Sequence, residues 1–278
     1  MTEVPLEYQE AVDTYEPIDF EGIKLYPIKV REYTAYMNAR PALDFLQQSL
    51  PVRFISMPLL SAFYKMDVEN RMEGKPSDGL FYRAVLFLIL STRFQEELSL
   101  EERIRNMTFL VSSEDHSILK EIKFEQGGEE KTITPVLFQR MRPILAAQNG
   151  IELVSTDANP ELVEAERDLA DLNGPELDAD LSSLISAVAA LSHADEKEIY
   201  DWPILKLHRR RDSYLRVLQF LLCGIAVSNG AQYKGGNPVP DPFFRRSNRN
   251  SGALIDMNAI TKGNTVSVSE SAPAGFQN

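Results

Sequence analysis

Residues 202–230, with the sequence WPILKLHRRRDSYLRVLQFLLCGIAVSNG, constrain the fold more than any other stretch. Apolar residues recur there every three or four positions, at Ile204, Leu207, Tyr214, Leu218, Leu221 and Ile225. This spacing is typical of one face of an α-helix. Pro203 suits a first helical turn, and Asn229-Gly230 suits a left-handed stop. We therefore expect a helix of about 27 residues, roughly 40 Å long.

Arg211 interrupts this apolar face, within the basic cluster His208-Arg209-Arg210-Arg211. An unpaired guanidinium is costly in a protein interior, so Arg211 must lie open or meet an acidic partner. Residues 152–201 contain 14 acidic and 2 basic side chains, a net charge of −12, whereas residues 206–249 contain 9 basic and 2 acidic ones, a net charge of +7. We predict that Arg211 contacts the acidic segment 152–201.

The N-terminal 150 residues alternate between hairpin and helix patterns. Period-two alternation predicts β-hairpins at 18–27, turning on Glu21-Gly22, and at 118–133. Helical spacing predicts helices at 30–50, restarted or kinked at Pro41, at 57–71 with Ser56 as N-cap, at 80–94 as a buried central helix, and from Thr134 to Asn149. Ser99 opens a capping box. Residues 1–17 lack periodicity.

Together these patterns predict a mainly α fold with one or two short β-hairpins (α+β), a long C-terminal amphipathic helix and a flexible tail. We expect a mostly helical domain with hairpins at 1–150. Acidic helices at 160–172 and 181–191, with the long basic helix packed on them, would form a second part at 151–230. Residues 231–278 are rich in Gly, Pro, Asn and Ser, which predicts an extended or disordered tail.

Charge and motif content narrow the class of function. A net charge of −12 argues against general affinity for nucleic acid or anionic membranes, which are polyanions. A single cysteine, Cys223, together with the absence of a secretory signal, predicts a cytoplasmic protein. The sequence lacks zinc-ligand spacing, a phosphate-binding loop and a hydrolase elbow. We therefore predict a non-enzymatic protein with no catalytic residues, no metal and no cofactor. An enzyme of unknown class stays a third alternative, based only on the general argument that a chain of this size can hold a pocket.

The basic cluster has two interpretations. Residues 206–216 could form a nucleic-acid-binding module that contacts phosphates, with Tyr214 available for stacking. Alternatively, the cluster neutralises the acidic segment that precedes it, and the net charge of the chain favours this interpretation. In the C-terminal tail, the apolar points are Phe243-Phe244 and Ala253-Leu254-Ile255.

Three dispersed segments carry a resemblance to a known family. They are Gly22–Val30, Asp201–Ile204 with Leu207-His208, and Asp241–Phe244 followed by Ser251–Ile255. In this layout the chain resembles the tail-module accessory proteins, including the tail assembly chaperones, of phages and prophages of Gram-positive bacteria.

The resemblance implies a non-enzymatic protein of the host-cell cytoplasm that holds the tape-measure or tail-tube protein soluble during virion assembly. The resemblance implies no catalytic residues in this chain. We place the candidate partner-binding residues at His208, Arg209, Arg210, Arg211, Tyr214, Phe243, Phe244 and Leu254. Nucleic acid and membrane are not expected partners, and self-association of the chain stays open.

Overall fold

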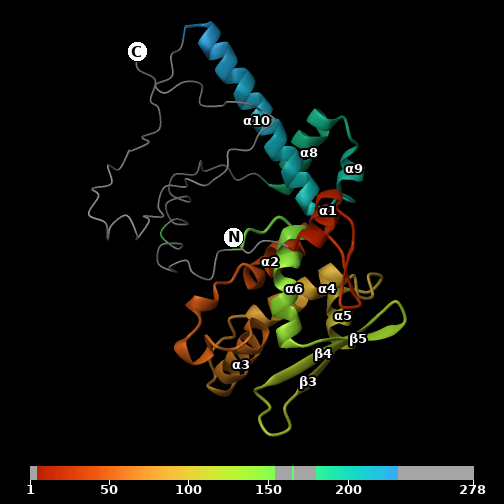
Figure 1. Ribbon diagram of the computed structural model, residues 1–278, viewed down its shortest axis with the longest axis vertical. Helices are drawn as coiled ribbons and strands as arrows, with labels where there is room; N and C mark the ends of the chain where they lie inside the picture. The colour runs from red at the N-terminus through yellow and green to blue at the C-terminus, as the bar shows by residue number, and fades with distance from the viewer. Residues whose placement is uncertain (1–4, 154–164, 166–179, 231–278) are drawn as a thin grey trace, which may run out of the picture. The chain divides into compact units, whose positions relative to one another are not determined.

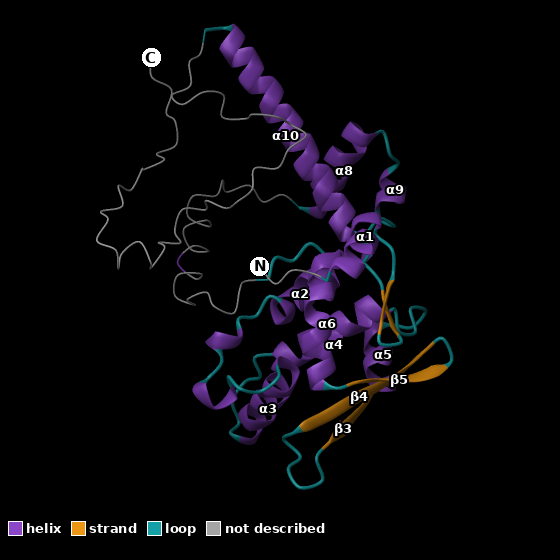
Figure 2. Cartoon of the chain, in the orientation of Figure 1, coloured by secondary structure: helices purple, strands orange, loops and turns teal. Residues whose placement is uncertain are grey.

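The structure of the chain is a computed structural model that describes residues 5–153, 165 and 180–230 (Figure 1). It is mainly helical and contains two small antiparallel sheets, which confirms the predicted α+β class (Figure 2). The chain divides into two compact units, one ending at Arg209 and the other beginning at Arg210. The predicted helix at 160–172, apart from residue 165, and the predicted tail at 231–278 lie outside the described residues.

The first unit opens with helix α1 (Leu6–Thr14) and a hairpin of β1 (Ile18–Phe20) and β2 (Ile23–Leu25). The hairpin confirms the prediction, and its turn falls at Glu21-Gly22, both with positive φ. The Oδ1 atom of Asp19 accepts a hydrogen bond from the Gly22 N–H at 2.9 Å, which closes the turn. Alternate strand residues are buried, as the period-two pattern predicts.

After a 3₁₀ turn, η1 (Val30–Glu32), helix α2 (Tyr33–Leu43) continues through Pro41. The helix predicted at 43–50 is absent, and only two 3₁₀ turns follow, η2 (Gln47–Ser49) and η3 (Val52–Phe54). Arg142 explains the difference, because its guanidinium donates to the carbonyls of Leu43 (2.7 Å) and Phe45 (2.6 Å). A continuing helix would need these carbonyls for its own backbone hydrogen bonds.

Helix α3 (Leu59–Met72) is preceded by Pro58 at its N-cap, without a side-chain cap, so the predicted capping role of Ser56 is wrong. Helix α4 (Leu80–Thr92) confirms the predicted buried helix, since every residue from Ala84 to Thr92 is buried. It packs against α2, α3, β2 and α5 (Leu100–Asn106), and thus forms the centre of the core. Helix α5 begins with the predicted capping box between Ser99 and Glu102.

A three-stranded sheet in the order β3-β4-β5 follows, formed by β3 (Thr108–Val111), β4 (Leu119–Gln126) and β5 (Glu129–Ile133). The β4-β5 hairpin was predicted, whereas β3 was not. Helix α6 (Pro135–Gln148) starts as predicted, with the Thr134 hydroxyl accepting from the Leu137 N–H at 3.1 Å.

Three helices complete the described chain: α8 (Leu181–Ser192), α9 (Glu196–Ile199) and α10 (Ile204–Ser228). Helices α8 and α10 confirm predicted helices, and the short α9 was not predicted. Helix α10 begins immediately after Pro203 and is followed by Gly230, whose φ of 93° provides the expected left-handed stop.

Candidate partner-binding surface

The base of α10 is held by backbone hydrogen bonds to the segment that follows the first hairpin. The N–H of Ile204 donates to the carbonyl of Ile28 at 2.9 Å, and the N–H of Val30 donates to the carbonyl of Trp202 at 2.9 Å. Ile28, Val30 and Ile204 are fully buried. The start of α10 is therefore fixed by residues more than 170 positions earlier in the chain.

Asp201, the last acidic residue before α10, also contacts the segment that follows the first hairpin. Its Oδ1 atom lies 3.6 Å from the Nζ atom of Lys29, and the guanidinium of Arg31 donates to the same oxygen. The carboxylate of Asp201 therefore neutralises N-terminal cations. Its charge is directed to Lys29 and Arg31 rather than to the basic cluster of α10.

Asn149 joins the end of α6 to the same region. Its Oδ1 atom accepts from the Ile28 N–H at 2.9 Å, and its carbonyl accepts from the Tyr36 hydroxyl at 3.1 Å. Burial raises the pKa of Tyr36 to about 12. Next to it, Gly150 has a φ of +70°, and a Cβ placed there would lie 3.1 Å from the Cδ1 atom of Leu205. The end of α6 and the base of α10 are thus in close contact.

Two residues of the predicted basic cluster, His208 and Arg209, belong to the first unit. Arg209 forms an ion pair with Asp13 of α1 at 2.8 Å, and its guanidinium lies 5.5 Å from the centre of the Tyr15 ring. The ring of His208 lies 6.4 Å from that of Tyr33. Both residues are half-buried. Both residues therefore make contacts within the first unit. The sequence analysis did not predict Asp13 as the acidic partner of Arg209.

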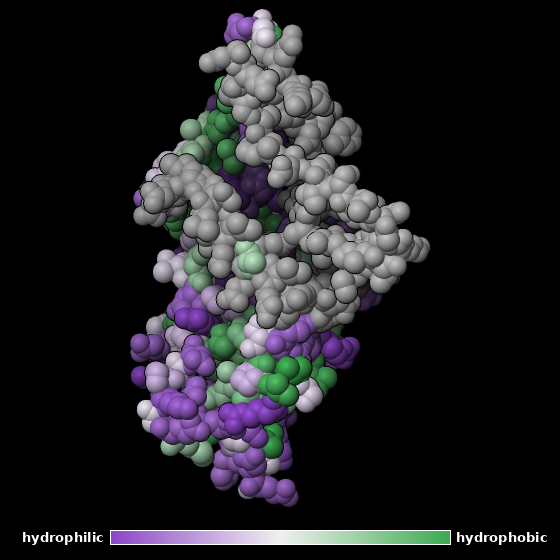
Figure 3. Space-filling view, turned by 90° about the vertical axis from the view of Figure 1, so that its left-hand side faces the viewer, coloured by the Kyte–Doolittle hydropathy of each residue, from purple (hydrophilic) through white to green (hydrophobic). Residues whose placement is uncertain are grey.

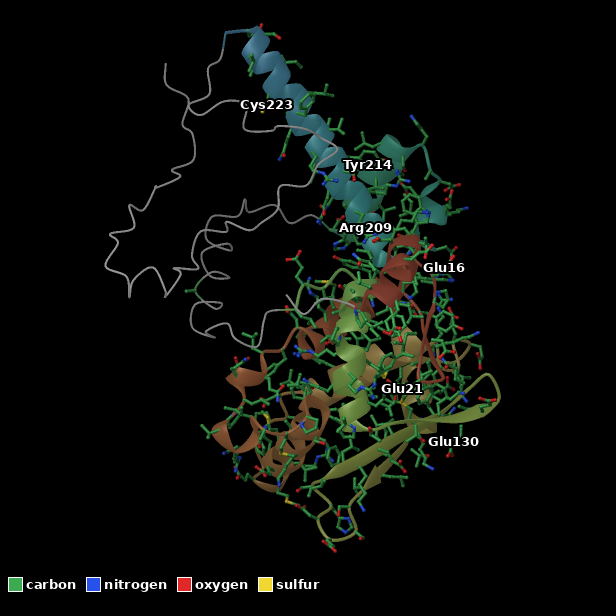
Figure 4. All side chains as sticks on the ribbon, in the orientation of Figure 1. Glu16, Glu21, Glu130, Arg209, Tyr214 and Cys223 are labelled. Carbon is green, nitrogen blue, oxygen red and sulfur yellow. The ribbon has the colours of Figure 1, made fainter. Side chains whose placement is uncertain are left out.

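The remaining predicted residues of α10 lie in the second unit, and Figure 4 labels Tyr214 among them. Arg210 is exposed, whereas Arg211 and Tyr214 are half-buried. Arg211 pairs with its neighbour Asp212 at 2.8 Å. The predicted contact with the segment 152–201 stays a prediction, because residues 154–164 and 166–179 lie outside the described part. Phe243, Phe244 and Leu254 also lie outside it.

Beyond Tyr214, α10 presents an exposed apolar surface that the sequence did not identify as a site. We call it the distal face, and it consists of Leu215, Val217, Leu218, Leu221, Leu222 and Ile225. These side chains are between 41% and 64% exposed. Figure 3 shows hydrophobic, green side chains on the surface in the upper part of the view. Single exposed apolar residues are ordinary, but six on one helical face indicate an interaction surface.

The helical spacing was correctly predicted, but the spacing alone does not indicate which part of the apolar face is covered. Ile204 and Leu207 at the base are fully buried, whereas Leu218, Leu221 and Ile225 on the same face are exposed. The sequence does hold a signal for the difference. From Leu215 to Ser228 the only charged residue is Arg216, so this length of helix lacks the charged surface expected of a solvated helix.

Within residues 5–153, 165 and 180–230, no three His, Cys, Asp or Glu side chains are grouped so that they could hold a metal ion. Among the helices in these ranges, none is both long enough and apolar enough to cross a membrane. This chain matches no protein-family model, no curated protein and no solved structure.

Proposed function

We propose that the protein is a non-enzymatic protein-binding factor and that the distal face of α10 is its interaction surface. The observation that carries the proposal is the contrast along one helical face. Its apolar residues are buried at Ile204 and Leu207, where backbone hydrogen bonds fix the helix, and exposed at Leu218, Leu221 and Ile225. A helix face of this kind is recognised by apolar side chains of a partner.

The energy available from this face indicates what kind of partner it needs. Fully burying an aliphatic side chain contributes roughly 1.5–3 kcal/mol. Because about half of each side chain is exposed, covering six of them contributes on the order of 5–9 kcal/mol. Association costs an estimated 4–15 kcal/mol, so the face offsets this cost only with a partner that also buries apolar surface.

We infer further that the partner belongs to phage tail assembly, as the tape-measure or the tail-tube protein, in the cytoplasm of the host cell. This part of the proposal rests on the resemblance of the segments at 22–30, 201–208 and 241–255 to tail-module accessory proteins. The exposed apolar face supports it, because a chaperone for an assembly protein must cover apolar surface that the finished assembly later buries.

Co-expression of the full chain with a cognate tape-measure fragment tests the proposal. We expect a complex that survives affinity purification with the wild type and is lost with Leu221→Glu/Ile225→Glu. A matched control, Gln219→Glu/Cys223→Glu, places the same two charges four residues apart on the opposite side of α10 and should retain the complex. Failure of the wild type to retain the tape-measure or the tail-tube protein would overturn the assignment to tail assembly.

The alternative, a nucleic-acid-binding module at 206–216, has less support. Arg209 is paired with Asp13 and Arg211 with Asp212, so two of its cations already contact carboxylates. Phosphate binding would have to compete with both ion pairs. The alternative predicts binding that weakens steeply with salt and is lost when Arg209, Arg210 and Arg211 are all replaced by alanine.

A further inference from the structure

The spacing within the distal face indicates the shape of what covers it. Tyr214, Leu218, Leu221 and Ile225 are separated by four, three and four positions, an average of about 3.7 residues, close to the helical period of about 3.6. An apolar stripe with this period runs along one side of a helix, where a second helix can pack. The occupant that fits the distal face is therefore a helix that packs along α10 over roughly three turns.

The residues that flank this stripe bear on the identity of that helix. In such pairs, charged residues on both flanks usually select one partner and reject others. Here the flanking residues are Leu215 and Leu222 on one side and Val217 and Gly224 on the other, all uncharged. Because these flanking residues are uncharged, no like charges repel each other when the distal face meets the same face of a second copy.

The distribution of charge along the chain also favours contact between two copies at this part of α10. The chain carries a net charge of −12, so two copies repel each other over most of their surfaces. Between Leu215 and Ser228 the only charge is Arg216, which the helical period places opposite Leu218 and Ile225. This stretch of α10 is thus a region where two copies can meet without bringing like charges into contact.

Gly224 adds room for close approach. It lies beside the stripe, and a Cβ built at this position meets no atom within 4 Å. A neighbouring helix can therefore approach the backbone of α10 here, as small residues permit at helix interfaces.

We propose that the distal face of α10 binds the same face of a second copy of this chain. This inference rests on the proposed function only in that it uses the same surface. About three helical turns form a short seam, so self-association is weak and depends on concentration. A weakly bound copy shields the apolar face in the absence of the assembly partner and can be replaced by it.

Sedimentation equilibrium of the full-length protein, under reducing conditions and from about 1 to 200 µM, tests the inference. The wild type should exceed the monomer mass of 31.4 kDa as concentration rises. Leu221→Glu/Ile225→Glu should raise the dissociation constant at least about 100-fold. Gln219→Glu/Cys223→Glu should leave it within about threefold, because these positions face away from the seam.

The fluorescence of Trp202, the only tryptophan, reports whether each variant keeps the buried base of α10. A wild type that stays monomeric throughout the range would overturn the inference. So would self-association of the folded Leu221→Glu/Ile225→Glu variant with unchanged affinity. A monomeric wild type that still binds the tape-measure fragment would refute self-association alone, and a dimer that binds neither tail protein would refute only the assembly function.

Discussion

The side chain of Asn149 connects two parts of the first unit that lie 121 positions apart in the chain. Its Oδ1 atom accepts from the Ile28 N–H at 2.9 Å, and its Nδ2 atom donates to the Leu145 carbonyl at 2.8 Å. Asn149→Ala leaves the buried Ile28 N–H without an acceptor. We expect a loss of about 2–3 kcal/mol in the free energy of unfolding, measured by urea denaturation followed through Trp202 fluorescence.

Asn38→Ala is the matched control, because Asn38 is exposed on α2. It should change the free energy of unfolding by less than about 0.5 kcal/mol. Equal effects of the two substitutions would show that the Ile28 N–H finds another acceptor and that Asn149 does not fix this segment.

Tyr36 makes stability depend on pH in the alkaline range. Burial raises the pKa of its hydroxyl from the ordinary value of 10.0 to about 12. Between pH 10 and 12 the unfolded chain loses this proton while the folded chain retains it. The free energy of unfolding therefore falls as pH rises, by up to about 1.4 kcal/mol per pH unit from this group alone.

Urea denaturation at several values between about pH 9 and 12 measures this slope. Tyr36→Phe should be less stable at pH 8 or so, because it loses the hydrogen bond to the Asn149 carbonyl. Its stability should then decline less steeply than that of the wild type above pH 10 or so. Parallel declines in the two proteins would contradict a raised pKa for Tyr36.

At the scale of elements, the contact between α6 and α10 depends on Gly150. Its φ of +70° disfavours any side chain, and a Cβ would lie 3.1 Å from the Cδ1 atom of the buried Leu205. Gly74 has a similar φ of +68° but no atom within 4 Å of an added Cβ. The two glycines therefore separate backbone strain from contact with α10.

We expect Gly74→Ala to lower the free energy of unfolding by about 1–2 kcal/mol through strain alone. Gly150→Ala should lower it by roughly 1 kcal/mol more, because Leu205 must also shift within its packed site. Denaturant titration of both variants makes the comparison. Equal losses would mean that Leu205 moves freely and that α6 and α10 are loosely packed there.

Elements with a strong local signal could be predicted from the sequence. The β1-β2 hairpin has alternating residues around Glu21-Gly22, α4 has an unbroken apolar run, and α5 has its capping box. Elements that depend on distant partners could not. Helix α1 buries only Val12, and β3 consists of four residues that pair with β4.

The same distinction applies to the candidate site. The helical period and both ends of α10 follow from local sequence, as does the position of its basic cluster. The ion pair between Arg209 and Asp13 spans 196 positions, so no local pattern indicates it. Nor does the period of α10 indicate where its apolar face stops being covered. That boundary depends on the hydrogen bonds that Ile28 and Val30 make with the base of the helix.

At the scale of the whole molecule, we propose that one helix serves two purposes. Its base, from Ile204 to Leu207, is part of the core of the first unit, whereas its distal face is exposed and is proposed to bind another protein chain. The two parts should therefore differ in how readily their backbone hydrogen bonds open, because burial protects amides from exchange.

Amide hydrogen exchange along α10, measured on the full-length protein at low and high concentration, distinguishes the base of the helix from its distal face. We predict slow exchange at 204–209 at both concentrations. Exchange at 214–228 should be fast in dilute solution and slower in concentrated solution, with Leu221→Glu/Ile225→Glu remaining fast at both. Equally slow exchange along the whole helix in dilute wild-type protein would contradict the claim, because the distal face would then already be covered within a single chain.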